Sequence, residues 1–162
     1  MIIKPQDKYT TLIELPPRGR TISFYNDANA NPEKYYINFP QLNFKISHWQ
    51  AADGMVRYSG LKALKTKNSY PFFPNMSLKD KGFCLGASYS ADNENDLCDK
   101  VMNAFWNTSF YWSPVLSHQF YMNDLFVEAA KDHKLLNFDI RDGIIHIYDD
   151  DFRVKRLYRI PT

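Results

Sequence analysis

The sequence predicts an α+β fold in which an antiparallel sheet forms first, helices pack on it, and a small β extension ends the chain. Three observations carry this prediction. Apolar and polar residues alternate along several segments before residue 65, as in strands with one solvent-facing side. Apolar residues recur at helical spacing between residues 93 and 133, and alternation returns from residue 136 onward. Strands followed by helices, rather than alternating with them, are typical of α+β proteins.

The first strands are expected on either side of a polar loop. Thr11–Leu15 is expected as an edge strand or an arm, and Ile22–Tyr25 as a strand. Residues 26–32 are rich in Asn, Asp and Pro, which predicts a loop. Tyr35–Trp49 is the clearest strand region, and after Pro40 its residues alternate between apolar and polar.

The next segments are expected to be shorter and less regular. Asp53-Gly54 predicts a turn between strands. Met55–Tyr58 and Leu61–Leu64 are expected as short strands that Gly60 separates. From Tyr70 to about Asp92 the chain contains prolines and glycines at close spacing, so we expect irregular structure there.

Two helices are expected after this irregular stretch. Asp92 is a good N-cap, and Glu94 and Asp96 suit a first helical turn, which favours a helix from about residue 93 to residue 109. Ser113-Pro114 then predicts the start of a second helix that ends near residue 133, because proline is tolerated at a first helical position.

The C-terminal part is expected to be a β extension. Leu136–Ile140 and Ile144–Tyr148 alternate on either side of Arg141-Asp142-Gly143, which predicts a hairpin. Phe152–Ile160 alternates again and is expected to add a strand.

The composition indicates one packed domain that spans residues 1–162. Hydrophobic residues make up 44% of the chain and aromatic residues 16%, which is enough for a large core. Twenty basic and eighteen acidic residues leave a formal charge of +2, too balanced to indicate nucleic acid binding. We therefore expect no nucleic acid partner.

The N-terminal sequence and the cysteine count favour a cytoplasmic protein. The first residues lack the apolar run of a signal peptide, and no stretch of about 18 apolar residues predicts a membrane span. Two cysteines are too few for a disulfide scaffold or a four-cysteine zinc site. We expect both thiols to be free, and we expect no membrane contact.

Most motifs of enzyme chemistry are missing from the sequence. The four histidines are dispersed and lack the spacing of metal ligands. No glycine-rich phosphate loop and no GxSxG nucleophile motif occur. We therefore expect no metal and no cofactor, which leaves cysteine chemistry.

The two cysteines have different surroundings in the sequence. Cys98 lies within the first expected helix, beside Leu97 and one turn from Val101, which favours a packing role as a small hydrophobe. Cys84 lies in the irregular stretch between Gly82 and Gly86, where a thiol can be partly exposed. The residues alone support catalysis by Cys84 and core packing of Cys84 equally.

Phe73-Pro74-Asn75 followed by Gly82-Phe83-Cys84-Leu85 resembles the ubiquitin-conjugating enzymes. These have His-Pro-Asn, a short glycine-containing loop and a catalytic Cys that is usually followed by Leu. The chain is also similar to bacterial relatives: protein B of the PRTRC plasmid system and the conjugating enzymes of ubiquitin-like antiphage operons. The resemblance covers roughly residues 36–112, through the segments Phe39–Phe44, Leu61–Lys65, Tyr70–Asn75, Gly82–Gly86 and Ala104–Phe110.

The sequence departs from the pattern of this family at several points. Gly82 is one residue closer to the cysteine than usual, and the residues after the motif lack the family's usual tryptophan spacing. Phe73 stands where the eukaryotic enzymes have His, and Asn75 and Cys84 are one residue further apart than usual. The expected C-terminal β extension stands where the family usually has a pair of helices.

The resemblance implies a ubiquitin-conjugating-enzyme-like fold and a thioester enzyme. Cys84 would accept a ubiquitin-like protein from an activating enzyme and pass it to an amine of a target protein. Asn75 would donate a hydrogen bond to the oxyanion that forms, or would only pin its loop by local hydrogen bonds. The bacterial resemblance implies a role in antiphage defence.

Two other interpretations remain at this stage. The first is a non-catalytic interaction module of the same fold, in which Cys84 is merely packed. The second is a redox or acyl-transferring thiol enzyme unrelated to ubiquitin. Asp80, Asp92 and Asp96 lie near Cys84 in the sequence, and each is expected to be a turn residue, a cap or a solvated charge.

Overall fold

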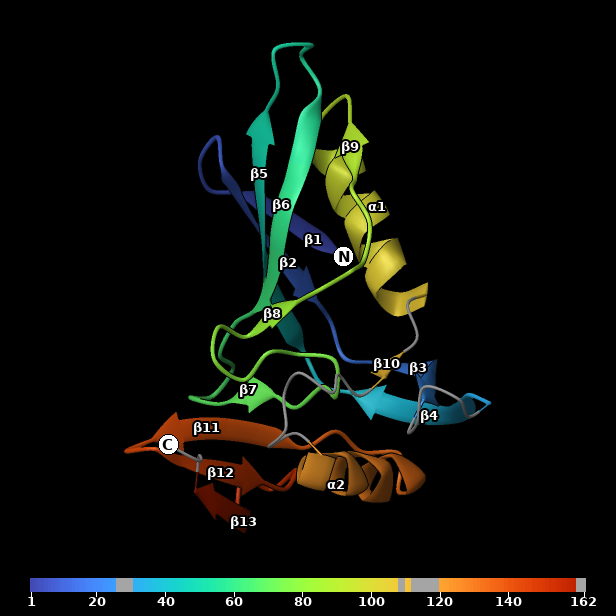
Figure 1. The fold of residues 1–162 in the computed structure, drawn as a ribbon, viewed down its shortest axis with the longest axis vertical. Coiled ribbons are helices and arrows are strands. Elements are labelled where there is room, and N and C mark those ends of the chain that lie inside the picture. Colours follow the sequence, from blue (N-terminus) through green and yellow to red (C-terminus); the bar gives the residue numbers. More distant parts are fainter. Residues whose placement is uncertain (26–30, 108–109, 112–119, 160–162) are drawn as a thin grey trace.

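The computed structural model of the protein describes residues 1–25, 31–107, 110–111 and 120–159. In this part of the chain thirteen strands form three sheets, and two helices accompany them. The predicted α+β class is therefore confirmed. Figure 1 shows the largest sheet beside the first helix in the upper part of the molecule, with the third sheet and the second helix below.

The largest sheet is antiparallel and has six strands, whose order begins β1-β2-β5-β6. Its last two strands are two residues long, and both pair with β6 at different points along its length. The strands of this sheet are β1 (Ile2–Pro5), β2 (Thr10–Leu15), β5 (Leu42–Gln50), β6 (Val56–Ala63), β8 (Gly82–Phe83) and β9 (Ser90–Ala91).

Two expectations for this sheet are corrected. The segment Thr11–Leu15 is not an edge or an arm, because β1 pairs with its outer side and β5 with its inner side. Gly60 does not divide β6, because the strand bulges at Ser59 and then continues. Ser47 of β5 pairs with Gly60, and His48 pairs with Tyr58, so Ser59 is the extra residue. The predicted turn at Asp53-Gly54 is confirmed, and Gly54 has the positive φ of 84° that favours glycine.

The second sheet contains β3 (Arg18–Tyr25), β4 (Glu33–Phe39) and β10 (Phe110–Tyr111). β3 and β4 are antiparallel, whereas β10 runs parallel to β3. The predicted strand region Tyr35–Trp49 is thus two strands in two sheets, separated at Pro40-Gln41. Most of the expected loop at residues 26–32 lies outside the described residues.

The third sheet has the order β13-β12-β11-β7 and includes the expected C-terminal hairpin. Asp142 and Gly143 have φ values of 54° and 73°, as a tight two-residue hairpin turn requires. The fourth strand was not expected: β7 comes from the irregular stretch and pairs with β11. The strands are β7 (Tyr70–Pro71), β11 (Asn137–Arg141), β12 (Ile144–Tyr148) and β13 (Val154–Arg159).

The first helix, α1, spans Glu94–Asn107 and begins one residue later than predicted. Its N-cap is Asn93 rather than Asp92, because the Asn93 Oδ1 accepts a hydrogen bond of 2.9 Å from the backbone N–H of Asp96. The predicted end at Ser109 lies outside the described residues. Neither helix is long and apolar enough to cross a membrane, as far as the described residues go.

The second helix, α2, spans Phe120–Lys131, so its described part ends slightly before the predicted residue 133. His133 has a positive φ of 61°, which is incompatible with continuing the helix. The predicted start at Ser113-Pro114 lies outside the described residues.

The buried apolar residues form one continuous core, and aromatic rings stand at its centre. The buried face of α1 contributes Phe105, whose ring centroid lies 4.9 Å from that of Phe83 and 5.5 Å from that of Phe73. The six buried phenylalanines linked by such contacts are called the ring cluster: Phe39, Phe44, Phe73, Phe83, Phe105 and Phe110. This cluster joins the first and second sheets to α1.

Replacing Phe73 with alanine is expected to lower the free energy of unfolding by about 3–5 kcal/mol. The Phe73 side chain is fully buried and touches four other rings of the cluster, so truncation leaves a cavity. Urea unfolding followed by circular dichroism measures the change. Leu157→Ala is the control, because Leu157 is 58% exposed and its loss is expected to cost less than about 0.5 kcal/mol. Equal costs for the two variants would contradict this account of the core.

Candidate active site

A tight turn precedes the cysteine loop. The N–H of Met76 donates a hydrogen bond of 3.3 Å to the carbonyl of Phe73, which closes a four-residue turn with Pro74 in its second position. Proline suits that position because its fixed φ matches the turn. Phe73 itself lies at the centre of the ring cluster, so the turn is anchored in the core.

A second turn, Ser77 to Gly82, brings the chain back toward β6. The N–H of Ser77 donates to the carbonyl of Gly82 at 2.9 Å, and the N–H of Lys81 donates to the carbonyl of Ser77 at 2.8 Å. The Asp80 carboxylate accepts a hydrogen bond of 2.9 Å from the N–H of Gly82, and this bond lowers the pKa of Asp80. Asp80 is therefore a turn residue, as expected.

Cys84 lies between two anchored apolar residues. Phe83 is 7% exposed and packs in the ring cluster, and Leu85 is 9% exposed in the same core. Alternating side chains of an extended chain point to opposite sides, so these two anchors turn the Cys84 side chain outward. Cys84 is exposed and free, which excludes core packing for this thiol.

The cysteine loop is an outward arch at the edge of the largest sheet. β6 pairs with β8 through Leu61 and Phe83, and it pairs with β9 through Arg57 and Ser90. Between these pairs only residues 58–60 of β6 remain, whereas the opposite chain has residues 84–89. The longer segment must bow out of the sheet.

This arch and β6 enclose an open depression of about 540 Å³ beside the thiol. Residues of β6 and of the chain from Phe83 to Ser88 line it. The residues that line it are Tyr58, Ser59, Gly60, Phe83, Cys84, Leu85, Gly86, Ala87 and Ser88.

Asn75 and Cys84 come close along the backbone, but their side chains have different surroundings. Met76 and Phe83 form an antiparallel bridge, and Asn75 and Cys84 directly adjoin this pair on the same side of it. Both polar atoms of the Asn75 amide are buried, and no described residue forms a hydrogen bond with them. The Asn75 side chain does not line the depression beside Cys84. Its role as an oxyanion donor stays a prediction.

Tyr58 is a site residue that the sequence did not reveal. The sequence predicts it only as a strand residue. Its place in the lining of the depression at Cys84 depends on the pairing of β6 with β8 and β9, which lie 20 to 35 residues further along the chain. Burial raises the pKa of its hydroxyl to about 12, with smaller contributions from the charges of Cys84 and Tyr89. No motif in the sequence signals this arrangement.

Cys98 has the packing role that the sequence predicted. It is fully buried in α1, and this burial raises the pKa of its thiol to about 11. A thiol in this state is neither accessible nor ionised near neutral pH, so Cys98 is a core residue.

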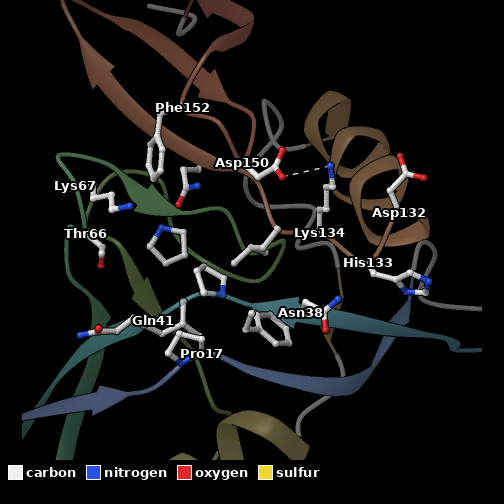
Figure 2. A pocket seen from close by; sticks show the side chains of 16 residues that line it. Pro17, Asn38, Gln41, Thr66, Lys67, Asp132, His133, Lys134, Asp150 and Phe152 are labelled. Atoms are coloured by element: carbon white, nitrogen blue, oxygen red, sulfur yellow. Dashed lines mark ion pairs between the residues drawn. The ribbon is translucent and has the colours of Figure 1, made fainter.

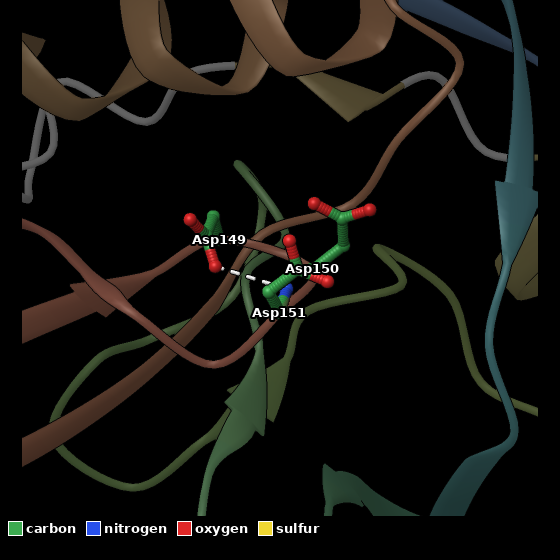
Figure 3. Close-up of side chains that lie close together, drawn as sticks. All are labelled: Asp149, Asp150 and Asp151. Atoms are coloured by element: carbon green, nitrogen blue, oxygen red, sulfur yellow. Dashed lines mark hydrogen bonds between the residues drawn. The ribbon is translucent and has the colours of Figure 1, made fainter.

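A group of three carboxylates lies in the loop between β12 and β13 (Figure 3). Asp149 Oδ1 already accepts hydrogen bonds of 2.9 Å from the backbone N–H groups of Asp151 and Arg153. Asp150 forms an ion pair of 3.3 Å with Lys134. These carboxylates therefore stabilise their own loop and the approach to β11.

A cavity of about 640 Å³ lies between the first two sheets and the C-terminal part (Figure 2). Three prolines line it, together with polar side chains such as Asn38 and Lys67. The Lys134–Asp150 ion pair stands at its edge, as Figure 2 shows. Neither cysteine borders this cavity, so it is separate from the site at Cys84.

Compared with known proteins, the chain matches no family model, no curated protein and no solved structure. The chemistry of the site is therefore inferred from its own residues.

Replacing Gly86 with alanine is expected to destabilise the arch by about 1–2 kcal/mol. Gly86 has a φ of 72°, and a side chain in this left-handed region meets its own backbone, although the space around it is open. Urea unfolding measures the loss. Gly60→Ala is the matched control, because Gly60 also faces open space but lacks a positive φ, and we expect it to be neutral or slightly stabilising. Equal destabilisation by both changes would show that crowding, not backbone conformation, limits this site.

Proposed function

We propose that this chain is a ubiquitin-like protein conjugating enzyme and that Cys84 carries the transferred protein as a thioester. The observation that carries the proposal is the exposed thiol of Cys84 on an arch whose neighbours, Phe83 and Leu85, are fixed in the core. A nucleophile held in this way keeps a fixed, accessible position relative to a partner protein. The open depression beside it leaves room for an extended acyl chain.

The proposed reaction has two steps. In the first, the Cys84 thiolate attacks the carbonyl carbon of a thioester on the activating enzyme, a new C–S bond forms, and the enzyme's thiolate leaves. In the second, an amine of the target attacks the same carbonyl, a C–N bond forms, and the Cys84 thiolate leaves. The proton lost by the amine passes to solvent. Cysteine suits both steps because thiolate is a good nucleophile and a good leaving group.

The order of elements supports the fold part of the proposal. Antiparallel strands, the Phe73–Met76 turn, the Cys84 arch and then α1 follow one another as the resemblance to ubiquitin-conjugating enzymes implies. Phe73 fills a buried position in the ring cluster, which supports a structural role for the residue that replaces His. We propose a ubiquitin-conjugating-enzyme-like fold whose C-terminal helices are replaced by the third sheet.

Asn75 is included in the proposal as a second donor to the reacting carbonyl. Its amide makes no hydrogen bond to any described residue, so the described surroundings give no support to the alternative in which it merely pins the loop. A change of side-chain rotamer would be needed to bring the amide to the depression. The cytoplasmic location, the target protein and the role in bacterial antiphage defence belong to the same proposal and rest on the resemblance.

Mixing the protein with ATP, an activating enzyme and a ubiquitin-like protein of the same organism is expected to give an adduct that thiols cleave. Non-reducing gel electrophoresis detects this adduct as a band that disappears on reduction. We expect Cys84→Ala to abolish the band, because the thiol is the attachment point. Cys98→Ala is the matched control and is expected to retain it, because Cys98 is buried.

Two outcomes would contradict the proposal. The absence of any adduct with the matched partners would favour a non-catalytic interaction module. An adduct that survives Cys84→Ala would remove the assignment of the site while leaving the activity in place.

A further inference from the structure

Tyr58, one of the residues that line the depression at Cys84, has a half-buried side chain that ends in a hydroxyl group. We infer that the Tyr58 hydroxyl donates a hydrogen bond to the carbonyl oxygen of the acyl group carried by Cys84, and that Tyr58 is therefore a catalytic residue of the transfer. This inference rests on the proposed function and adds the Tyr58 hydroxyl to its active site.

The position of Tyr58 follows from the geometry of the arch. Tyr58 is the first β6 residue inside the gap between the β8 and β9 pairings, and its N–H donates a hydrogen bond of 2.9 Å to the carbonyl of Tyr89. Its backbone is thus fixed at one end of the gap. Cys84 begins the arch at the other end, and both residues line the depression between them.

The ring of Tyr58 is held by a second contact. It meets the ring of Tyr89 edge to face, with centroids 5.8 Å apart. Among the described residues, none accepts a hydrogen bond from the Tyr58 hydroxyl. A positioned donor with a free hydrogen bond is what a carbonyl that develops negative charge requires.

The hydroxyl also keeps its proton under the conditions of transfer. Burial and the nearby charge of Cys84 raise its pKa to about 12, above the ordinary value of about 10. Tyr58 is therefore a hydrogen-bond donor and not a base. In the proposed step the amine nitrogen bonds to the carbonyl carbon, the oxygen becomes an oxyanion, and Tyr58 stabilises it without giving up its proton. The C–S bond to Cys84 then breaks and the thiolate leaves.

Other polar groups at the depression are less suited to this role. The side chains of Ser59 and Ser88 line it too, but both residues are exposed, so water competes for their hydroxyls. Asn75 does not line the depression, and its amide is buried elsewhere. Among the polar residues that line the depression, Tyr58 alone combines partial burial with a ring contact that holds its side chain.

A small thioester tests this role without any partner protein. In a Cys98→Ala background, an excess of the mercaptoethanesulfonate thioester of acetylglycine acylates Cys84 by thiol exchange, and intact-mass spectrometry follows the product. After removal of excess probe, free lysine is added and the loss of the acyl group is timed. We expect Tyr58→Phe to slow this loss at least tenfold and up to about 100-fold.

Tyr89→Phe is the matched control. It removes a hydroxyl from the neighbouring ring but keeps the edge-to-face contact, and its rate is expected to stay within twofold of the parent. A Tyr58→Phe rate within twofold of the parent would overturn the inference. So would an equal loss in Tyr89→Phe, or a Cys84 thiol that the excess probe does not acylate. These outcomes concern the inference about Tyr58 alone. The failure of the ubiquitin-like protein to form its adduct is a different result, and it would contradict the proposed function.

Discussion

The packing of Phe73, Phe83 and Phe105 against one another is the interaction on which the rest of the site depends. The three ring centroids lie 4.9–5.7 Å apart, and each ring belongs to a different segment: the proline turn, the strand that precedes Cys84, and α1. Edge-to-face contacts of this kind add directional preference to the free energy gained by burying the rings. These contacts fix the start of the arch to the core, and the Cys84 thiol that follows therefore lies outside the core.

The same contacts explain how an irregular stretch of chain can have a well-defined position. Residues 70–92 contain only short strands, yet most of their apolar side chains are buried and their ends are paired. β7 ties one end to the C-terminal sheet, where the N–H of Phe72 donates a hydrogen bond of 2.9 Å to Leu136, and β9 ties the other end to β6. The arch is therefore a loop supported at both ends, which gives Cys84 a defined place without burying it.

The sequence was informative where the signal is local. The helix with its buried Cys98, the Asp142-Gly143 hairpin turn and the α+β class all follow from spacing or turn chemistry within a few residues. It was uninformative where the outcome depends on distant pairing. Two-residue strands such as β8 and β9 are too short to carry a pattern, and the place of Tyr58 beside Cys84 exists only through them. The expectation that Gly60 separates two strands is wrong, because the bulge at Ser59 lets β6 continue through Gly60.

The central claim is that Cys84 forms the covalent bond, and peptide mapping of the wild-type adduct tests it most directly. After incubation with ATP, the activating enzyme and the ubiquitin-like protein, the account expects a mass gain equal to that protein minus one water. Rapid digestion at low pH should leave the C-terminal peptide of the ubiquitin-like protein attached to the peptide that contains Cys84, and hydroxylamine should remove it. A gain that resists hydroxylamine, or that maps to a peptide without Cys84, would contradict the claim.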